Sequence, residues 1–423
     1  MNTILLRGAR QLLTLRGPAG PRRGTALGEL GIVQDGAVLI RDGRIDDLGQ
    51  GRRVENLASA RGAREIDVTG RVVLPGFVDS HTHLTWGPPR LAGFEVSSGR
   101  RQPLDRAAMS RAALACAQTL RTSPSRTLER QARERLAMFV RHGTTTLEAQ
   151  SGGFDHTSDL KALRVLEKLT ESPLDVTPTY CGAHALPSEY EGRAHEYVEW
   201  IISEMLPLVR RRRLAASADV WCGRGALSID DARRYLVAAR AAGFALRVHA
   251  EQFSHDGGAR LAVEVGAASA GHLQFADRDD IAILAQSSTI ATLTPGAAFH
   301  LGLDRRPPGR ALVDQGAAVA LATDFSPVTS PTCSMPMVLS LACTDMRMTP
   351  AEAVSAATIN GAHALGCADR VGSLEEGKYA DLTVFDVPDY REIPYTFGVN
   401  LVSMTIKRGV VLYRRGDVEW QAR

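Results

Sequence analysis

The 423-residue sequence lacks the features that mark several large classes of protein. No apolar run approaches the roughly 18 residues of a membrane helix, so we expect no membrane partner. The net charge of +3 gives no reason to expect a nucleic-acid partner, and the short basic run at 210–213 is expected to lie on a solvated surface. There is no Gly-x-Gly-x-x-Gly after a first strand, which argues against a dinucleotide cofactor.

The cysteines also form no recognisable framework. Six are scattered along the chain, and none belongs to a Cys-x-x-Cys pair. This pattern predicts reduced, mostly buried thiols in a cytoplasmic protein. Residues 1–23 contain arginines but no apolar stretch of signal-peptide length, so we expect a first strand and a loop there.

The most informative stretch runs from 72 to 84, with the sequence VVLPGFVDSHTHL. An apolar strand, a Pro-Gly break and a second short strand lead into His81 and His83. On an extended chain residues i and i+2 point to the same face, so both imidazoles can meet one metal ion. The alternative is a pair of surface histidines in a loop. The apolar strand before them favours a buried strand end.

Both ends of the chain are rich in short β signals. Asp42-Gly43 and Arg408-Gly409 are each flanked by apolar runs and predict two hairpins, and 378–386 predicts another strand. Short strands at both ends need a common core, so we expect one small β-sandwich domain built from both. The expected domains are a composite of 1–72 with 366–423, and a central domain of 73–365.

The central region alternates strand and helix patterns. Helical periodicity covers 132–140, 160–169, 228–243 and 350–365. Eight strands separated by helices predict a TIM-type (β/α)8 barrel in the α/β class, with a doubly wound open sheet as the alternative. The expected strands are 77–79, 145–148, 175–180, 218–222, 245–249, 268–272, 289–292 and 318–322.

Further candidate ligands fall at the ends of these strands. His249 ends the fifth strand, His272 ends the sixth, and Asp324 follows the eighth. The C-terminal strand ends of such a barrel converge on one face, so His81, His83, His249 and Asp324 can surround one ion. Three imidazole nitrogens and one carboxylate suit Zn²⁺ or Fe²⁺.

These residues carry a resemblance to the amidohydrolase superfamily. The Pro75–His83 motif, the histidines at successive strand ends, Asp324 and the closing 372–382 segment are typical of it. Within it the chain resembles the imidazolonepropionase family over nearly its whole length. The segments that carry this closer resemblance are 182–187, 257–262, 321–325 and 393–400.

The resemblance implies a metal-dependent hydrolase that opens a cyclic amide or amidine C–N bond, converting imidazolone propionate to N-formimino-L-glutamate. Asp324, His272 and Gln252 are the implied catalytic residues. Relatives with two metals bridge them with a modified lysine at the end of strand four; none stands at 180–184, so we expect one divalent ion, Zn or Fe. The alternatives are a related deaminase or hydantoin-type hydrolase, and a catalytically silent scaffold.

The resemblance also implies a substrate pocket, and the sequence departs from the family there. Arg90 is expected to bind a substrate carboxylate, and His184, Thr329 and Gln252 to contact the ring. Gly153 stands where the family has a substrate-contacting tyrosine, and Ser326 and Val328 replace family residues after Asp324. These changes fit either a paralogue with another ring substrate or the family reaction in an altered pocket. We expect a small-molecule substrate, with a homodimer as the assembly.

Overall fold

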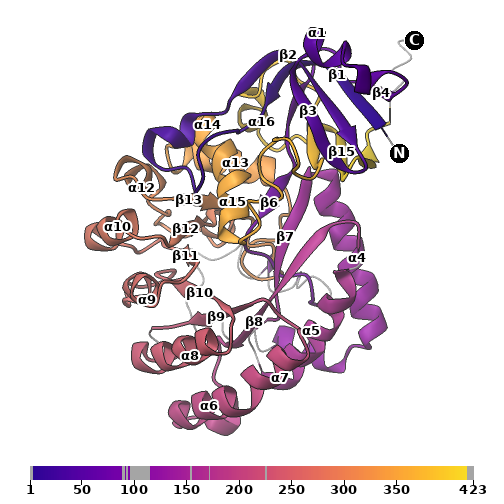
Figure 1. The fold of residues 1–423 in the computed structure, drawn as a ribbon. Coiled ribbons are helices and arrows are strands. Elements are labelled where there is room, and N and C mark those ends of the chain that lie inside the picture. The colour runs from indigo at the N-terminus through magenta and orange to yellow at the C-terminus, as the bar shows by residue number, and fades with distance from the viewer. Residues whose placement is uncertain are drawn as a thin grey trace.

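A computed structural model describes residues 3–87, 91, 94–95, 115–152, 155–170, 172–223 and 226–416. The described chain forms two eight-stranded sheets (Figure 1). One is a barrel of consecutive parallel strands with helices around it. The other lies at one end of the barrel and contains strands from both ends of the chain, indigo and yellow in Figure 1.

The end sheet joins segments that are about as far apart in sequence as the chain allows. Its order is β16-β15-β14-β5-β1-β2-β3, and β4 pairs with β1. Both predicted hairpins are present, β2 with β3 and β15 with β16, and the prediction that strands from both chain ends pack together is confirmed by their shared sheet. Its strands are β1 (Thr3–Leu13), β2 (Ile32–Arg41), β3 (Arg44–Gln50), β4 (Arg64–Asp67), β5 (Val72–Pro75), β14 (Leu382–Phe385), β15 (Val402–Lys407) and β16 (Val410–Arg414).

The barrel contains the eight strands expected from the apolar runs, in sequence order and all parallel. Its first and last strands meet beyond their ends, where Thr82 bridges Phe325. The TIM-type barrel is therefore confirmed. Its strands are β6 (Phe77–Asp79), β7 (Thr144–Gln150), β8 (Asp175–Ala183), β9 (Ser217–Trp221), β10 (Ala245–Ala250), β11 (Ser269–His272), β12 (Ile290–Leu293) and β13 (Val319–Leu321).

The chain passes from one sheet to the other at Gly76. Before it, β5 pairs with β1 and β14; after it, β6 pairs with β7. A side chain at Gly76 would clash with Thr145, so the close approach of the two sheets requires glycine. The domain limits of 72 and 366 expected from the sequence stay a proposal.

The helices around the barrel begin and end at ordinary signals. At α8 (Ile229–Ala241), the N-cap Ser228 accepts a hydrogen bond from Asp231 N–H, and Gly243 just beyond the helix has a φ of 85°. The α-helices are α1 (Gly51–Glu55), α4 (Ser125–Arg141), α5 (His156–Leu169), α6 (Ala194–Trp200), α7 (Leu206–Arg211), α8 (Ile229–Ala241), α9 (Gly258–Glu264), α10 (Arg278–Ala285), α11 (Pro295–His300), α12 (Gly309–Asp314), α13 (Met335–Thr344), α14 (Pro350–Ala356), α15 (Ile359–Ala364) and α16 (Glu392–Tyr395).

One predicted helix is wrong. The periodic segment 350–365 is two short helices, α14 and α15, separated at Ala357 and Thr358. Thr358 leaves the helical region with a φ of −126° and a ψ of −93°. The turn lets α15 press against β6, where a side chain at Gly361 would clash with the Val78 carbonyl. Tertiary packing therefore overrides the local helical pattern.

Two main apolar cores match the two sheets. The larger one joins the barrel interior to the helix layer, and a smaller one packs between strands of the two chain ends, with Leu6, Val38 and Ile406 among its members. The barrel core fixes the strand ends from which the candidate site projects. Among the described helices, none combines the length and apolar character needed to cross a bilayer.

Candidate metal centre and active site

The first and last barrel strands bring three predicted ligands together. His81 and His83 follow β6, and their Nε2 atoms lie 3.6 and 3.7 Å from Asp324 Oδ1. Two backbone hydrogen bonds join the segment after β6 to the segment after β13, and we call this junction the seam. Asp324 N–H donates to the His81 carbonyl (3.0 Å), and His83 N–H donates to the Phe325 carbonyl (2.8 Å). The i, i+2 spacing of the two histidines therefore places both beside one carboxylate.

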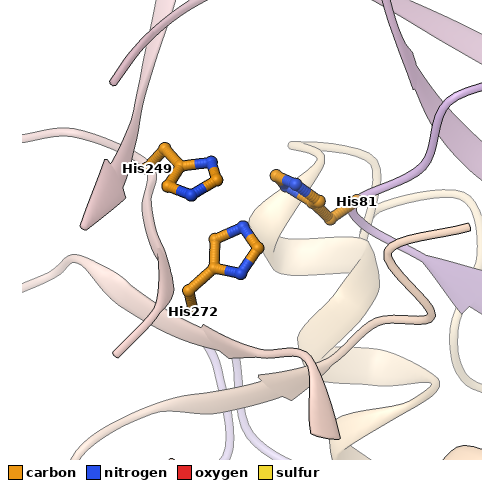
Figure 2. A group of neighbouring side chains, drawn as sticks. All are labelled: His81, His249 and His272. Carbon is orange, nitrogen blue, oxygen red and sulfur yellow. The ribbon is translucent and has the colours of Figure 1, made fainter. Parts of the chain in front are cut away.

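Two further histidines project from the neighbouring strands β10 and β11. The rings of His249 and His272 lie 3.8 Å apart at an angle of 28°, and each is near His81. Figure 2 shows the three imidazoles facing a common space. His249 Nε2 is 2.7 Å from Gln252 Oε1, and His272 Nδ1 is 3.0 Å from Thr294 Oγ1.

Burial keeps these two imidazoles uncharged. It lowers the pKa of His249 and of His272 well below the usual histidine value, so both are neutral near pH 7. Neutral imidazole is the form that binds metals. The backbone at the site is also strained: His272 has a φ of 74° and Asp324 a φ of 51°. Such conformations persist where the surrounding structure enforces them.

The donor atoms of the site fit a metal ion. His81 Nε2, His272 Nε2 and Asp324 Oδ2 are buried and have no hydrogen-bond partner among the described residues. Orphaned buried polar atoms are costly, and a cation at this point would satisfy those of His81 and Asp324. Two groups of potential ligand atoms within 4.8 Å share His81: one adds His249 and His272, the other adds His83 and Asp324.

This geometry bears on the predicted ligand set. The structure brings His81, His83 and Asp324 into one group, but His249 joins His81 in the other group, where His272 stands beside it. His272, expected outside the ligand set, is thus as close to His81 and His249 as a ligand would be. The mononuclear set of four stays a prediction.

A buried polar network extends the site toward β8 and β9. His184 Nε2 lies 3.0 Å from Asp219 Oδ1, and Gln150 Nε2 donates to Asp219 Oδ2 at 3.1 Å. Gln150 Nε2 also lies 3.3 Å from His81 Nδ1. Burial alone would raise the pKa of Asp219, but the hydrogen bond to His184 and the nearby imidazoles lower it, so the carboxylate is charged.

Asp219 and this role of Gln150 were missed from the sequence. The available signal was a single carboxylate within the apolar strand 218–222, at a position that alternation places on one face with residue 221. Nothing in one strand, however, identifies its partner on another.

The remaining predicted pocket residues are only partly described. Ser326 and Thr329 bond to each other through their hydroxyls, and Thr329 N–H donates to Ser326 Oγ at 3.0 Å. Both sit in the loop that follows Asp324. Arg90 and Gly153 lie outside the described residues.

The barrel and its donor set are those of metal-dependent hydrolases. The Amidohydrolase family model matches residues 72–412. Imidazolonepropionases from Solibacter usitatus (strain Ellin6076) and Geobacillus kaustophilus (strain HTA426) are each 42% identical to this chain, over 98% and 99% of it and all of each relative. The chain belongs to the amidohydrolase family and, within it, groups with the imidazolonepropionases. It is a hydrolase that acts on C–N bonds.

Solved structures agree on the fold. A triazine hydrolase variant matches with a TM-score of 0.75 at 19% identity, over 98% of this chain and 95% of that one. A zinc-bound adenosine deaminase from Xanthomonas campestris matches with a TM-score of 0.72 at 17% identity, over 99% and 94%. At such identities the likeness establishes the barrel architecture and says nothing about the substrate.

Proposed function

We propose that the protein hydrolyses imidazolone propionate to N-formimino-L-glutamate. The observation that carries this proposal is the set of buried, unsatisfied histidine and aspartate atoms at the barrel mouth, in a chain that aligns end to end with imidazolonepropionases. The reaction adds water across a ring C–N bond: the carbon gains the hydroxyl oxygen and the ring nitrogen leaves with a proton.

The cofactor in this proposal is one divalent ion, Zn²⁺ or Fe²⁺, held by His81, His83, His249 and Asp324. The ion supplies Lewis-acid activation of the attacking water near neutral pH. The orphaned His81 Nε2 and Asp324 Oδ2 support this assignment.

The protein's own residues then move the proton. Asp324 accepts it from the attacking water and passes it to the leaving ring nitrogen. His272, held by Thr294 through Nδ1, directs its free Nε2 toward the oxyanion that develops on the attacked carbon. Gln252 keeps its Nε2 unpartnered and buried, available to orient the water or a ring nitrogen.

Substrate binding falls to residues around this centre. Arg90 is proposed to pair with the propionate carboxylate, since its planar fork matches that group. His184, oriented by Asp219, and Thr329 with Ser326 contact the ring. Gly153 stands where the resemblance implies a ring-contacting tyrosine, and a glycine has no side chain to make that contact.

A second candidate, hydrolysis of another small heterocycle, rests on the departures at Gly153, Ser326 and Val328. A turnover assay with imidazolone propionate, followed by hydantoins, dihydropyrimidines and purine or pyrimidine amines, separates the two. Turnover of imidazolone propionate that falls with Arg90→Ala supports the first proposal. An inert imidazolone propionate, together with a neutral heterocycle turned over regardless of Arg90, would leave only the broader amidohydrolase assignment.

A cytoplasmic location and a homodimer also remain proposals. Tyr395, Phe397 and Val399 expose large apolar side chains on one short segment, which is a feature of protein–protein contact surfaces. Sedimentation analysis of the purified protein tests the dimer directly.

A further inference from the structure

Arg135 is an unusual residue on the barrel-facing side of α4. Its side chain is buried, and no carboxylate of the described residues forms an ion pair with it. Its guanidinium instead donates to three backbone carbonyls: Nη1 to Leu84 at 2.6 Å, and Nη2 to Trp86 at 2.8 Å and Gly87 at 3.2 Å. It also lies 3.7 Å from the centre of the Trp86 ring.

This arrangement is specific to residue 135. Burial lowers the pKa of Arg135 to about 10, so it remains a cation at neutral pH. The neighbouring Arg130 and Arg133 are exposed and pair with glutamates of their own helix. A buried cation is costly unless its N–H donors find hydrogen-bond acceptors. Here the acceptors are backbone carbonyls of one short segment, 84–87.

That stretch comes directly after His83 and is tied to it. Trp86 Nε1–H donates to the His83 carbonyl at 3.1 Å. The Trp86 ring lies 5.7 Å from the ring of Phe325, the residue after Asp324. The Phe325 carbonyl in turn accepts the His83 N–H at 2.8 Å.

The same helix supports the other side of the seam. Phe139 lies one turn after Arg135 on α4 and meets Phe325 edge to face, with ring centroids 5.1 Å apart. Arg135 therefore fixes the segment after His83, and Phe139 fixes the segment after Asp324. Both act on the point where the first and last barrel strands join.

We propose that Arg135, acting through Trp86, is a positioning residue of the metal centre, which sets the orientation of His83 toward Asp324. The proposal rests on the metal centre proposed above. The residue that orients His83 would then lie on α4, outside the ring of barrel strands. Its side chain would act without contacting the ion or the substrate. The guanidinium fork is required, because a lysine ammonium cannot direct donors at three carbonyls with the same geometry.

The test uses the full-length protein loaded with Co²⁺, whose visible absorption reports ligand geometry. Arg135→Met and Arg135→Lys are compared with Arg133→Met, an exposed arginine of the same helix. We expect both Arg135 variants to shift the cobalt spectrum and to release the ion to a chelator about tenfold faster or more, the scale seen when groups that orient a ligand are removed. Arg133→Met should match the parent protein.

Turnover gives an independent readout. The Arg135 variants should lower kcat for imidazolone propionate more than they raise KM, whereas a purely structural role would lower only the fraction of folded protein. Unchanged cobalt spectra and release rates in folded Arg135 variants would overturn the proposal.

Trp86→Phe decides the matter if Arg135 variants do not fold. It keeps the ring but deletes the hydrogen bond to the His83 carbonyl, so it should show a smaller shift in the same direction. If it matches the parent protein, the proposal is wrong. A parent protein that binds no cobalt would instead refute the metal centre itself, and this inference with it.

Discussion

The two ends of the barrel strands hold buried polar clusters of opposite character. At the C-terminal end, His81, His272 and Asp324 keep buried atoms without a partner among the described residues. At the N-terminal end, beside the end sheet, Lys407 Nζ is 2.6 Å from a carboxylate oxygen of both Asp175 and Asp381.

In the second cluster each charged group has a partner of opposite charge. Arg408 N–H donates to Asp381 Oδ1 at 2.9 Å, and its guanidinium reaches Asp175 at 2.6 Å. The cluster joins β15 of the end sheet to the first residue of β8 in the barrel. Its charges are neutralised and its geometry is fixed, which suits a joint between two domains.

The two clusters show that buried polar groups can serve either the stability of the fold or the binding of a ligand. A satisfied cluster stabilises the fold and has nothing left to offer a ligand. An unsatisfied one costs stability and persists where a ligand or reaction completes it. Substitutions at the first end should therefore change chemistry with little effect on stability, and substitutions at the second should do the reverse.

The largest effect is expected at His249. Its change to alanine removes one predicted ligand, and the protein should lose most of its metal and more than about a thousandfold of its turnover, because metal activation is worth several kcal/mol. Elemental analysis and steady-state kinetics measure both. His195→Ala, an exposed histidine paired with Asp231, is the matched control. A metal content near one ion per chain in His249→Ala would remove His249 from the ligand set.

Lys407→Met should act on stability instead. It leaves the buried Asp381 carboxylate without its cation, which typically costs about 3–5 kcal/mol of unfolding free energy. Burial already raises the pKa of Asp381, and Lys407 opposes that shift. Without Lys407 the carboxyl of Asp381 has a higher pKa in the folded than in the unfolded protein. The loss of unfolding free energy in the variant should therefore become smaller as the pH falls.

Denaturant titration at several pH values measures this loss. Arg7→Met, which breaks an exposed pair with Glu65, should cost under about 1 kcal/mol. Metal content and kcat of folded Lys407→Met should equal those of the parent protein. A folded variant that had lost its metal would mean that the two ends of the barrel are not independent.

His272→Asn should lower turnover by roughly a hundredfold or more, the scale of losing an acid–base or oxyanion group. Metal content and melting temperature should stay near those of the parent protein. Metal analysis is the sharper measurement, because His272 lies as close to His81 and His249 as a ligand would. Loss of the ion would make His272 a ligand and refute the predicted set of four.

The sequence predicted those parts of the molecule that depend on local pattern. The barrel strands are buried on both faces, so they read as short apolar runs, and the end of each run located His249 and His272. The break at Thr358 was not predictable, because it follows from the contact between Gly361 and Val78 across the fold.

The same distinction holds for the site. The pairing of His184 with Asp219 joins two strands and requires distances that no single strand encodes. Arg135 is still less visible in sequence: it stands in the arginine- and glutamate-rich segment 129–135 and resembles its exposed neighbours until its contacts are known.

The smallest effect is expected at Gly153, which stands where the imidazolonepropionase family has a tyrosine. A phenol there would pack on the substrate ring and donate a hydrogen bond, contacts worth about 1–3 kcal/mol or roughly ten- to a hundredfold in rate. Gly153→Tyr should therefore raise kcat/KM for imidazolone propionate by about tenfold, the lower end of that range. Gly153→Phe lacks the hydroxyl, so it should give only the part of the increase that comes from packing on the ring. Unfolding free energy should change far less than in Lys407→Met. The contrary result is that Gly153→Tyr lowers kcat/KM for imidazolone propionate and raises kcat/KM for none of the other heterocycles. That result would mean that the substrate ring does not lie against position 153, and this position would no longer support the substrate assignment.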